Sequence, residues 1–275
     1  MPDSRTAFMK AVGVAGVGMV APGIESWSSG RKLLSSGNAY DIAAEFLALK
    51  PSSLSANERR RATDTIKLAL QCAQDAMDDQ TEVKASGPDL TSVFASSSGD
   101  LNIVDKILTA LTLPGKPVSP THFHNSVHNA PAGYWSIATA SRAASSSIAA
   151  GPQTFSAGLL EAMTQVIIDR HPVLLIAYDL MSPSVLRSHS QVKASFGAAI
   201  VLVPEPTRYS LSTEIRDAAV SASTMQEPGF EQLRQANPAA ICLPLLQNIA
   251  QKQSAMINLP YLHGQGLELS LVCND

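Results

Sequence analysis

Short apolar runs alternate along this chain with stretches in which apolar residues recur every three or four positions. Six of the runs have the composition of strands, at residues 11–20, 90–95, 142–150, 173–177, 196–203 and 267–272. Residues 209–215 alternate between apolar and polar side chains, which is typical of an edge strand. These runs predict the strands of a sheet.

Helical spacing fills the segments between the runs. A capping box formed by Ser55 and Glu58 precedes residues 57–79, where apolar residues recur at helical intervals. Asp100 is placed to cap a short amphipathic helix that follows a Ser-Ser-Ser-Gly turn. Both stretches are therefore predicted to be helices.

Two further helical regions lie in the second half of the chain. One begins near Thr154 and ends before His171, which is followed by proline. Residues 231–251 predict two short helices divided at Pro238 or Pro244. The alternation of strands and helices predicts an α/β fold, with a mostly parallel sheet covered by helices on both faces.

Residues 112–129 are predicted to form an ordered loop, because prolines at 114, 117 and 120 oppose a helix. Three histidines lie in this stretch, namely His122, His124 and His128. Their spacing alone allows a metal cluster, but no acidic or cysteine partner is near them in sequence, so no metal is expected. The aromatic residues nearby are expected to pack in the core or at an interface, namely Phe123, Tyr134 and Trp135.

The composition excludes several classes of partner. The chain has 275 residues, a formal net charge of −3 and only 16% charged residues, which gives no basic footprint for nucleic acid or an anionic membrane. Hydrophobic residues make up 45% of the chain and the mean hydropathy is +0.07. Such values are high for a monomer and indicate buried surface shared with a partner.

No targeting segment, membrane span or cofactor motif is recognised. Charged residues, Gly or Pro interrupt each apolar stretch well before about 18 residues, and residues 1–19 lack a clean apolar core with a cleavage site. The first glycines do not form the dinucleotide fingerprint GxGxxG, and no cofactor is expected. Three isolated cysteines, Cys72, Cys242 and Cys273, form no disulfide or zinc pattern, which suits the cytoplasm.

The most informative stretch spans residues 119–162. It contains the motif SVHNxxAGxxSI at residues 126–137, then Arg142, a small-residue strand, a Gly-Pro turn and Ala157-Gly158-Leu159. This order resembles the first half of a β-ketoacyl synthase of the thiolase fold. It is most similar to the short β-ketoacyl synthase-like, N-terminal relatives of that family.

The resemblance implies where a nucleophile would lie. In that family a strand leads to a catalytic cysteine, and a glycine three residues later opens a buried central helix. Anchoring on Gly158 places Phe155 at the nucleophile position, whereas alignment from Arg142 without a gap places Pro152 there. Neither residue is a cysteine, and the family's two catalytic histidine motifs have no clear counterpart. The chain is therefore not expected to be an enzyme by itself.

The resemblance also implies the domain organisation. It predicts a single thiolase-like domain over residues 1–275, with the N-terminal half complete and the C-terminal half truncated. Residues 1–204 carry the resemblance, and residues 205–275 form a divergent C-terminal part.

The implied function is that of a partner subunit. The chain is similar to chain-length factors, which lack the nucleophile and pair with an active β-ketoacyl-ACP synthase to shape the acyl tunnel. Short members resemble those of aryl-polyene type pathways, within the type II polyketide and fatty-acid-like systems. The expected partners are a catalytic ketosynthase in a heterodimer and, transiently, an acyl carrier protein, although a second copy of the chain remains open as the partner.

The family's dimer geometry implies an interface and tunnel set. It comprises Phe123, Ser126, His128, Asn129, Tyr134, Ser145, Ser146 and Ser147. The strand at 144–149 is expected to pair with its counterpart across the interface, because an unpaired strand edge is otherwise exposed. The alternative function is a stand-alone acyltransferase or hydrolase with Ser147 or Ser156 as nucleophile, although no GxSxG elbow is present.

Overall fold

The computed structural model describes residues 9–85, 90–217 and 221–274. Within these residues, eight strands form one sheet in the order β3-β2-β4-β5-β1-β6-β8-β7. The strands are β1 Val12–Val20, β2 Thr91–Ala95, β3 Ser145–Ile148, β4 Val173–Asp179, β5 Phe196–Val203, β6 Tyr209–Arg216, β7 Ala255–Pro260 and β8 Gly266–Cys273. Every strand predicted from the apolar runs is present, although β3 is shorter than the predicted 142–150.

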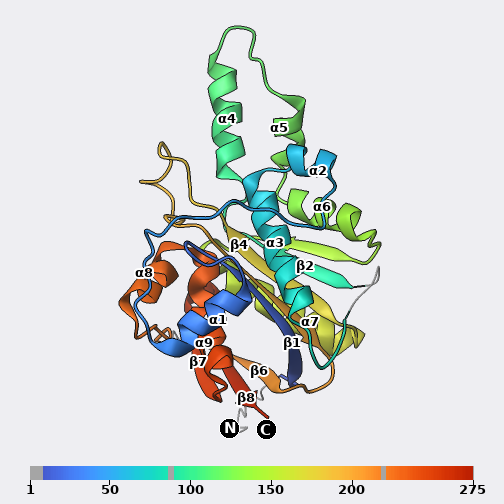
Figure 1. The fold of residues 1–275 in the computed structure, drawn as a ribbon, viewed down its shortest axis with the longest axis vertical. Helices are drawn as coiled ribbons and strands as arrows, with labels where there is room; N and C mark the ends of the chain where they lie inside the picture. The colour runs from blue at the N-terminus through green and yellow to red at the C-terminus, as the bar shows by residue number, and fades with distance from the viewer. Residues whose placement is uncertain (1–8, 86–89, 218–220, 275) are drawn as a thin grey trace.

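Nine α-helices lie in the same described residues. They are α1 Trp27–Ser36, α2 Ala56–Arg61, α3 Asp64–Asp78, α4 Leu101–Thr112, α5 Pro120–Asn125, α6 Ala130–Thr139, α7 Thr154–Asp169, α8 Pro228–Ala236 and α9 Leu243–Gln251. Short 3-10 turns add η1 Gly151–Gln153, η2 Pro238–Cys242 and η3 Leu262–Gly264. Figure 1 shows α4 and α5 projecting from one end of the molecule as an arm, with α1 and α9 toward the other end.

The core has two layers because the central strands bury both faces. Along β4, the side chains of Val173, Leu175 and Ala177 enter one apolar cluster, and those of Leu174 and Ile176 enter the other. Helix α7 packs in the first cluster and α3 in the second. Helices on both faces of the sheet were predicted, and this part of the fold prediction is confirmed.

The prediction of a mostly parallel sheet is wrong. Strand β2 is parallel to β3 and to β4, whereas the β4–β5, β5–β1, β1–β6, β6–β8 and β8–β7 pairs are antiparallel. Parallel neighbours need a crossover connection. Helices α4 to α6 supply it between β2 and β3, and α7 supplies it between β3 and β4. The connections from β4 to β5 and from β7 to β8 contain no such α-helix.

The expectation that residues 209–215 form an edge strand is also wrong. Strand β6 pairs with β1 on one side and with β8 on the other. Strand β7, which was not predicted, forms the edge instead and is joined to β8 through η3. The polar alternation of β6 arises because its outer face stays partly exposed although both backbone edges are paired.

Two helix predictions need correction. The helix predicted over 57–79 is divided, because Ala62 is extended and the Thr63 hydroxyl accepts the Ile66 N–H at 3.3 Å to start α3. Residues 112–129 are not all loop, because Ser119 caps α5 and Pro120 occupies its first turn. A proline there removes only an N–H that has no helical partner. The predicted division at Pro238 is confirmed, since η2 begins there.

Helix α3 is held against β1 by glycines and carboxylates. Gly18 allows close approach, since a Cβ there would lie 2.1 Å from the Cys72 carbonyl oxygen. The Asp75 carboxylate accepts the Met19 N–H at 2.9 Å, and the Asp79 carboxylate accepts the Val17 N–H at 3.1 Å. These side chains satisfy backbone donors of β1 that lie beyond its short pairing with β6.

Candidate functional site

The turn from β3 into α7 is the feature on which the predicted nucleophile position depends. Gly151 has φ of 55°, a left-handed conformation that glycine adopts without strain. The Thr154 hydroxyl accepts the Ala150 N–H at 2.9 Å and donates to the Gly151 carbonyl at 2.7 Å. The structure thus has the strand, turn and helix order that the sequence predicted.

The two candidate nucleophile positions lie in different surroundings. Phe155 is only 1% exposed and belongs to the core cluster beneath α7. Pro152 is exposed and lines a surface cavity of about 400 Å³ together with Ser97, Leu101 and His189. Neither side chain carries a group that can attack an acyl thioester.

Within the described part of the chain, neither serine proposed for the alternative function has a hydrogen-bonded base. The Ser156 hydroxyl is fully buried and has no hydrogen-bond partner among the described residues. Ser147 is half-buried in β3, where it pairs with Phe94 of β2. A catalytic serine needs a base within hydrogen-bond reach. In the described residues, neither the Ser156 nor the Ser147 hydroxyl has such a base.

A buried polar cluster lies at the carboxyl ends of the parallel strands. One Asp179 carboxylate oxygen accepts the Ser96 hydroxyl and the Ser97 N–H, both at 2.9 Å. The Ser96 hydroxyl also accepts the Gly99 N–H at 3.0 Å. The His128 Nε2 lies 2.9 Å from the Ser96 carbonyl oxygen, which can only accept, so Nε2 carries the proton. This cluster holds the turn after β2 beside the start of α4.

Burial raises the pKa of Asp179 to about 7, although hydrogen bonds from Ser96 and Ser97 favour the charged form. The second carboxylate oxygen has no partner within the described part of the chain. Sequence analysis did not single out this residue. The available signal was an acidic residue that ends a fully apolar strand, which is unusual unless the acid has a role.

The outer edge beside β3 exposes unusual apolar surface. Strand β3 pairs only with β2, so its other backbone edge is uncovered in the described chain. Three large apolar side chains protrude on α5, on α6 and between them: Phe123 is 69% exposed, Val127 53% and Ile137 64%. Leu108 and Leu111 on α4 are exposed as well. Monomeric proteins seldom expose such a group of large side chains without a partner.

The other predicted interface residues lie next to this exposed apolar surface. Tyr134 is 7% exposed, and its hydroxyl donates to the Asn125 side chain at 3.3 Å. Ser126 donates to the Phe123 carbonyl at 2.8 Å, and Asn129 is exposed directly before α6. Ser145 and Ser146 lie in β3, where the Ser92 hydroxyl donates to the Ser145 hydroxyl at 3.0 Å. Helix α6, which carries Tyr134, contacts both β2 and β3, and His128 contacts Ser96 directly after β2.

In the described residues, no three potential ligands among His, Cys, Asp and Glu gather closely enough to hold a metal ion. None of the described helices has the length and apolar character needed to cross a bilayer.

Comparison with known proteins identifies relatives at the level of family and fold. The family model of the β-ketoacyl synthase, N-terminal domain matches residues 32–262, and so extends past residue 204. No curated protein sequence matched the chain. Among solved structures, the ketosynthase ApeO in complex with its chain length factor ApeC from Xenorhabdus doucetiae has a TM-score of 0.69 at 22% identity, covering 95% of this chain and 100% of that chain.

Two further structures have the same architecture. The ishigamide ketosynthase/chain length factor has a TM-score of 0.71 at 12% identity, covering 97% of this chain and 100% of that chain. The type II polyketide synthase complex AntDE:AntF, an acyl-carrier protein with its ketosynthase, has a TM-score of 0.74 at 11% identity, covering 96% and 99%. These likenesses confirm the predicted thiolase-like fold, here with a mixed sheet.

Proposed function

We propose that this chain, which belongs to the β-ketoacyl synthase, N-terminal domain family, is a non-catalytic, chain-length-factor-like subunit. It pairs with an active β-ketoacyl-ACP synthase and shapes the acyl tunnel of the pair. The observation that carries the proposal is the combination of a turn without a thiol at the start of α7 and an uncovered strand edge beside exposed apolar residues.

The position of the thiols supports a partner role. Condensation needs a thiolate, which enzymes activate at a helix N-terminus or beside a cation. The three cysteines of this chain lie at positions 72, 242 and 273, so none is part of the turn into α7, although η2, which ends at Cys242, contacts α7 and η1. Burial raises the pKa of both the Cys72 and Cys242 thiols, which keeps them protonated. The subunit therefore relies on its partner for the nucleophile.

The β3 edge supports the mode of pairing. A strand of the partner added beside Ser145–Ile148 would satisfy the free backbone groups and join the two sheets. Small serine side chains permit the close approach that this requires. With the arm and α6 wrapped beside the junction, the buried area is expected to exceed about 2,000 Å², as in obligate pairs.

Three similarities favour the pathway class. The solved structures include ketosynthases with chain length factors, one of them ApeO with ApeC. Another contains an acyl-carrier protein with its ketosynthase. We extend this by analogy to a type II polyketide or fatty-acid-like pathway of the aryl polyene type in the cytoplasm, with transient visits by an acyl carrier protein.

Co-expression with a candidate ketosynthase tests the proposal. The two chains should co-purify as a heterodimer, and the pair should produce acyl chains whose length changes when the subunit is exchanged. Ser146→Asp should separate the pair, because an unpaired charge buried at the junction costs about 3–5 kcal/mol, or at least roughly a hundredfold in affinity.

Ser254→Asp provides a matched control. Ser254 is exposed and directly precedes β7 at the opposite edge of the sheet. The same substitution there should leave co-purification unchanged. A wild-type chain that stays monomeric beside its ketosynthase, or a Ser146→Asp variant that still co-purifies, would contradict the proposal.

A further inference from the structure

A second cavity lies at the end of the molecule opposite the α4–α5 arm. It has a volume of about 400 Å³ and is lined by residues of α1, β1, β6 and α9 and of the segments beside α3 and β6. Figure 1 shows where α1, β1 and α9 lie in the fold. Cavities of about 300–1,000 Å³ are typical of small-molecule sites. The cavity shares no residue with the β3 edge or the turn into α7, so it stays distinct from the proposed partner surface.

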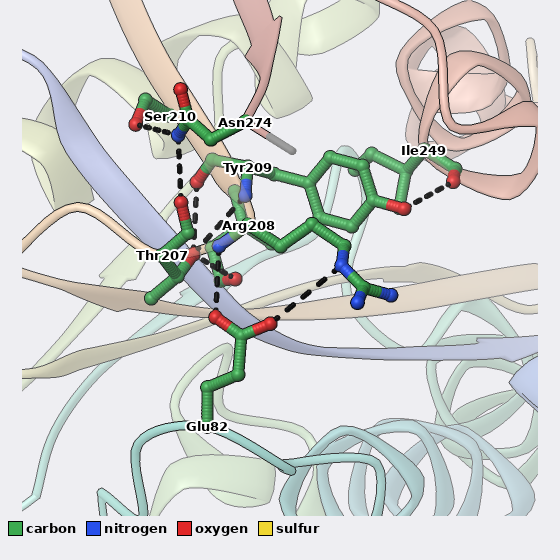
Figure 2. Close-up of polar contacts among 8 residues, drawn as sticks. Glu82, Thr207, Arg208, Tyr209, Ser210, Ile249 and Asn274 are labelled. Carbon is green, nitrogen blue, oxygen red and sulfur yellow. Dashed lines mark hydrogen bonds and ion pairs between the residues drawn. The ribbon is translucent and has the colours of Figure 1, made fainter.

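The floor of this cavity is apolar and buried. It is lined by Val14, Ala15, Val17, Trp27, Ile249 and Ala250. A shift in the pairing register of β1 with β5 occurs between Val14 and Gly16, where the strand leaves its regular ladder and faces the cavity. The Tyr209 ring forms part of the wall, and its hydroxyl donates to the Ile249 carbonyl at 3.0 Å (Figure 2).

The rim is cationic, and its charges come from three separate segments. Arg31 and Lys32 lie on α1, Arg208 lies just before β6, and Lys252 follows α9. All four residues are exposed, so their charged groups reach the mouth of the cavity rather than its floor. Cations gathered around a low-dielectric wall attract anions more strongly than isolated surface cations do.

The two carboxylates of the cavity are already engaged. Figure 2 shows the Glu82 carboxylate accepting the Arg208 backbone N–H at 2.8 Å, with its other oxygen 3.8 Å from the Arg208 Nε. Burial raises the pKa of Asp79, although the hydrogen bond that its carboxylate accepts from the Val17 N–H and the nearby Arg31 guanidinium both favour the charged form. In the described part of the chain, Lys32 and Lys252 form no ion pair, so their charges remain available.

The backbone conformation of Lys252 is uncommon for a residue with a side chain, and Lys116, Ala140 and Arg170 share it. Lys252 caps α9 in the left-handed conformation, with φ of 55°. Glycine is the residue usually found at such a position, because a side chain there strains the backbone. A lysine that tolerates this strain places its charge at the cavity mouth.

We propose that this cavity binds a small phosphate monoester, with the dianionic phosphate between Lys32, Lys252 and Arg31 and the organic part against the Trp27 floor. A phosphate monoester carries nearly two negative charges at neutral pH, which matches the two lysines that lack a carboxylate partner. The apolar floor selects an organic group over a bare ion. This assignment does not depend on the proposed pairing with a ketosynthase.

Tryptophan fluorescence provides a direct test, because the chain has two tryptophans and Trp27 lines the cavity. In the full chain carrying Trp135→Phe, titration with phenyl phosphate should change the Trp27 emission with a Kd of about 1 mM or tighter. Inorganic phosphate should bind at least about tenfold more weakly, and phenylacetate, with a single charge, should also bind more weakly.

Charge variants locate the site. Lys32→Glu should weaken phenyl phosphate binding by at least about tenfold, whereas Lys50→Glu, an exposed lysine outside the cavity, should leave it unchanged. Lys252→Gly removes a charge while relieving the left-handed strain, so it should weaken binding without loss of thermal stability. The proposal is overturned by absence of saturable phenyl phosphate binding, by equal binding of inorganic phosphate or phenylacetate, or by equal loss in the Lys32 and Lys50 variants.

Discussion

Truncation of Phe155 to alanine tests whether packing, rather than ligand chemistry, holds the turn into α7. The ring is 1% exposed and contributes to the core cluster that contains Leu159 and Met163 of the same helix. Removing a buried phenylalanine ring typically costs about 3–5 kcal/mol. Single domains are stable by only about 5–15 kcal/mol in total, so this one change should remove a large share of the stability.

The expected loss is large enough to measure by two methods. In a chain of this size, each 1 kcal/mol corresponds to about 2–4 °C in Tm, so Phe155→Ala should lower Tm by roughly 6–20 °C. Urea unfolding followed by circular dichroism should show the same loss as a lower midpoint with an unchanged slope.

Phe123→Ala is the matched control, because it removes the same ring from a side chain that is 69% exposed. In the isolated chain it should change the free energy of unfolding by no more than about 0.5 kcal/mol, and it should weaken the proposed pairing with a ketosynthase. If both variants lost equal stability, or if Phe155→Ala stayed within that same margin of the wild type, the packing argument would be refuted.

The same variant tests a functional idea that rests on the proposed pairing. We hypothesise that the Phe155 ring plugs this subunit's own pocket below the turn. When a second, stabilising substitution or a low temperature keeps the Phe155→Ala subunit folded and paired, the pair should then yield products of altered length. Unchanged folding together with unchanged product length would count against the plug.

Three further outcomes are expected. Burial raises the pKa of Asp179 in the folded chain to about 7, above an unfolded value near 3.9. Its contribution to the free energy of unfolding is therefore complete below about pH 4 and is lost as pH rises toward 7. The stability of Asp179→Asn should not show this decline, and parallel pH profiles of the two proteins would contradict the assignment. Gly158→Ala should destabilise the chain by about 1–3 kcal/mol in thermal melts, because its Cβ would lie 2.8 Å from the Ala95 Cβ, and an unchanged Tm would argue against this tight contact. Phe155→Cys should form no acyl-enzyme when mass spectrometry follows incubation with an acyl-carrier thioester, because that position is buried in the core. An adduct there, or on Ser156, would favour an enzymatic role.

The local features of the fold were predictable because neighbouring residues determine them. Apolar runs identified β1, β2, β4, β5 and β8, and caps such as Ser55 and Asp100 marked where helices begin. The motif at 126–137 pointed to the family, and the residues at 152 and 155 showed that no thiol occupies the turn.

Strand direction and edge position depended on the whole chain. Residues 209–215 alternate as an edge strand does, yet β6 is paired on both sides, because β1 and β8 arrive from segments far away in the sequence. Likewise, the region of continuous helical periodicity over 57–79 is divided at Ala62, which is extended and buried in the core, and Thr63 then caps α3. Periodicity within a segment carries no information about these distant contacts.

Only the tertiary structure revealed the polar cluster and the cationic cavity. Asp179 and Ser96 are 83 positions apart, and the charges at the cavity come from Arg31, Arg208 and Lys252 on separate elements. Burial and electrostatic environment arise when such elements pack together, so no local pattern predicts them. The sequence by itself determined most of the strands, the caps of α2 and α4 and the absence of a thiol from the turn into α7, whereas packing decided strand directions, buried charges and which surfaces remain uncovered.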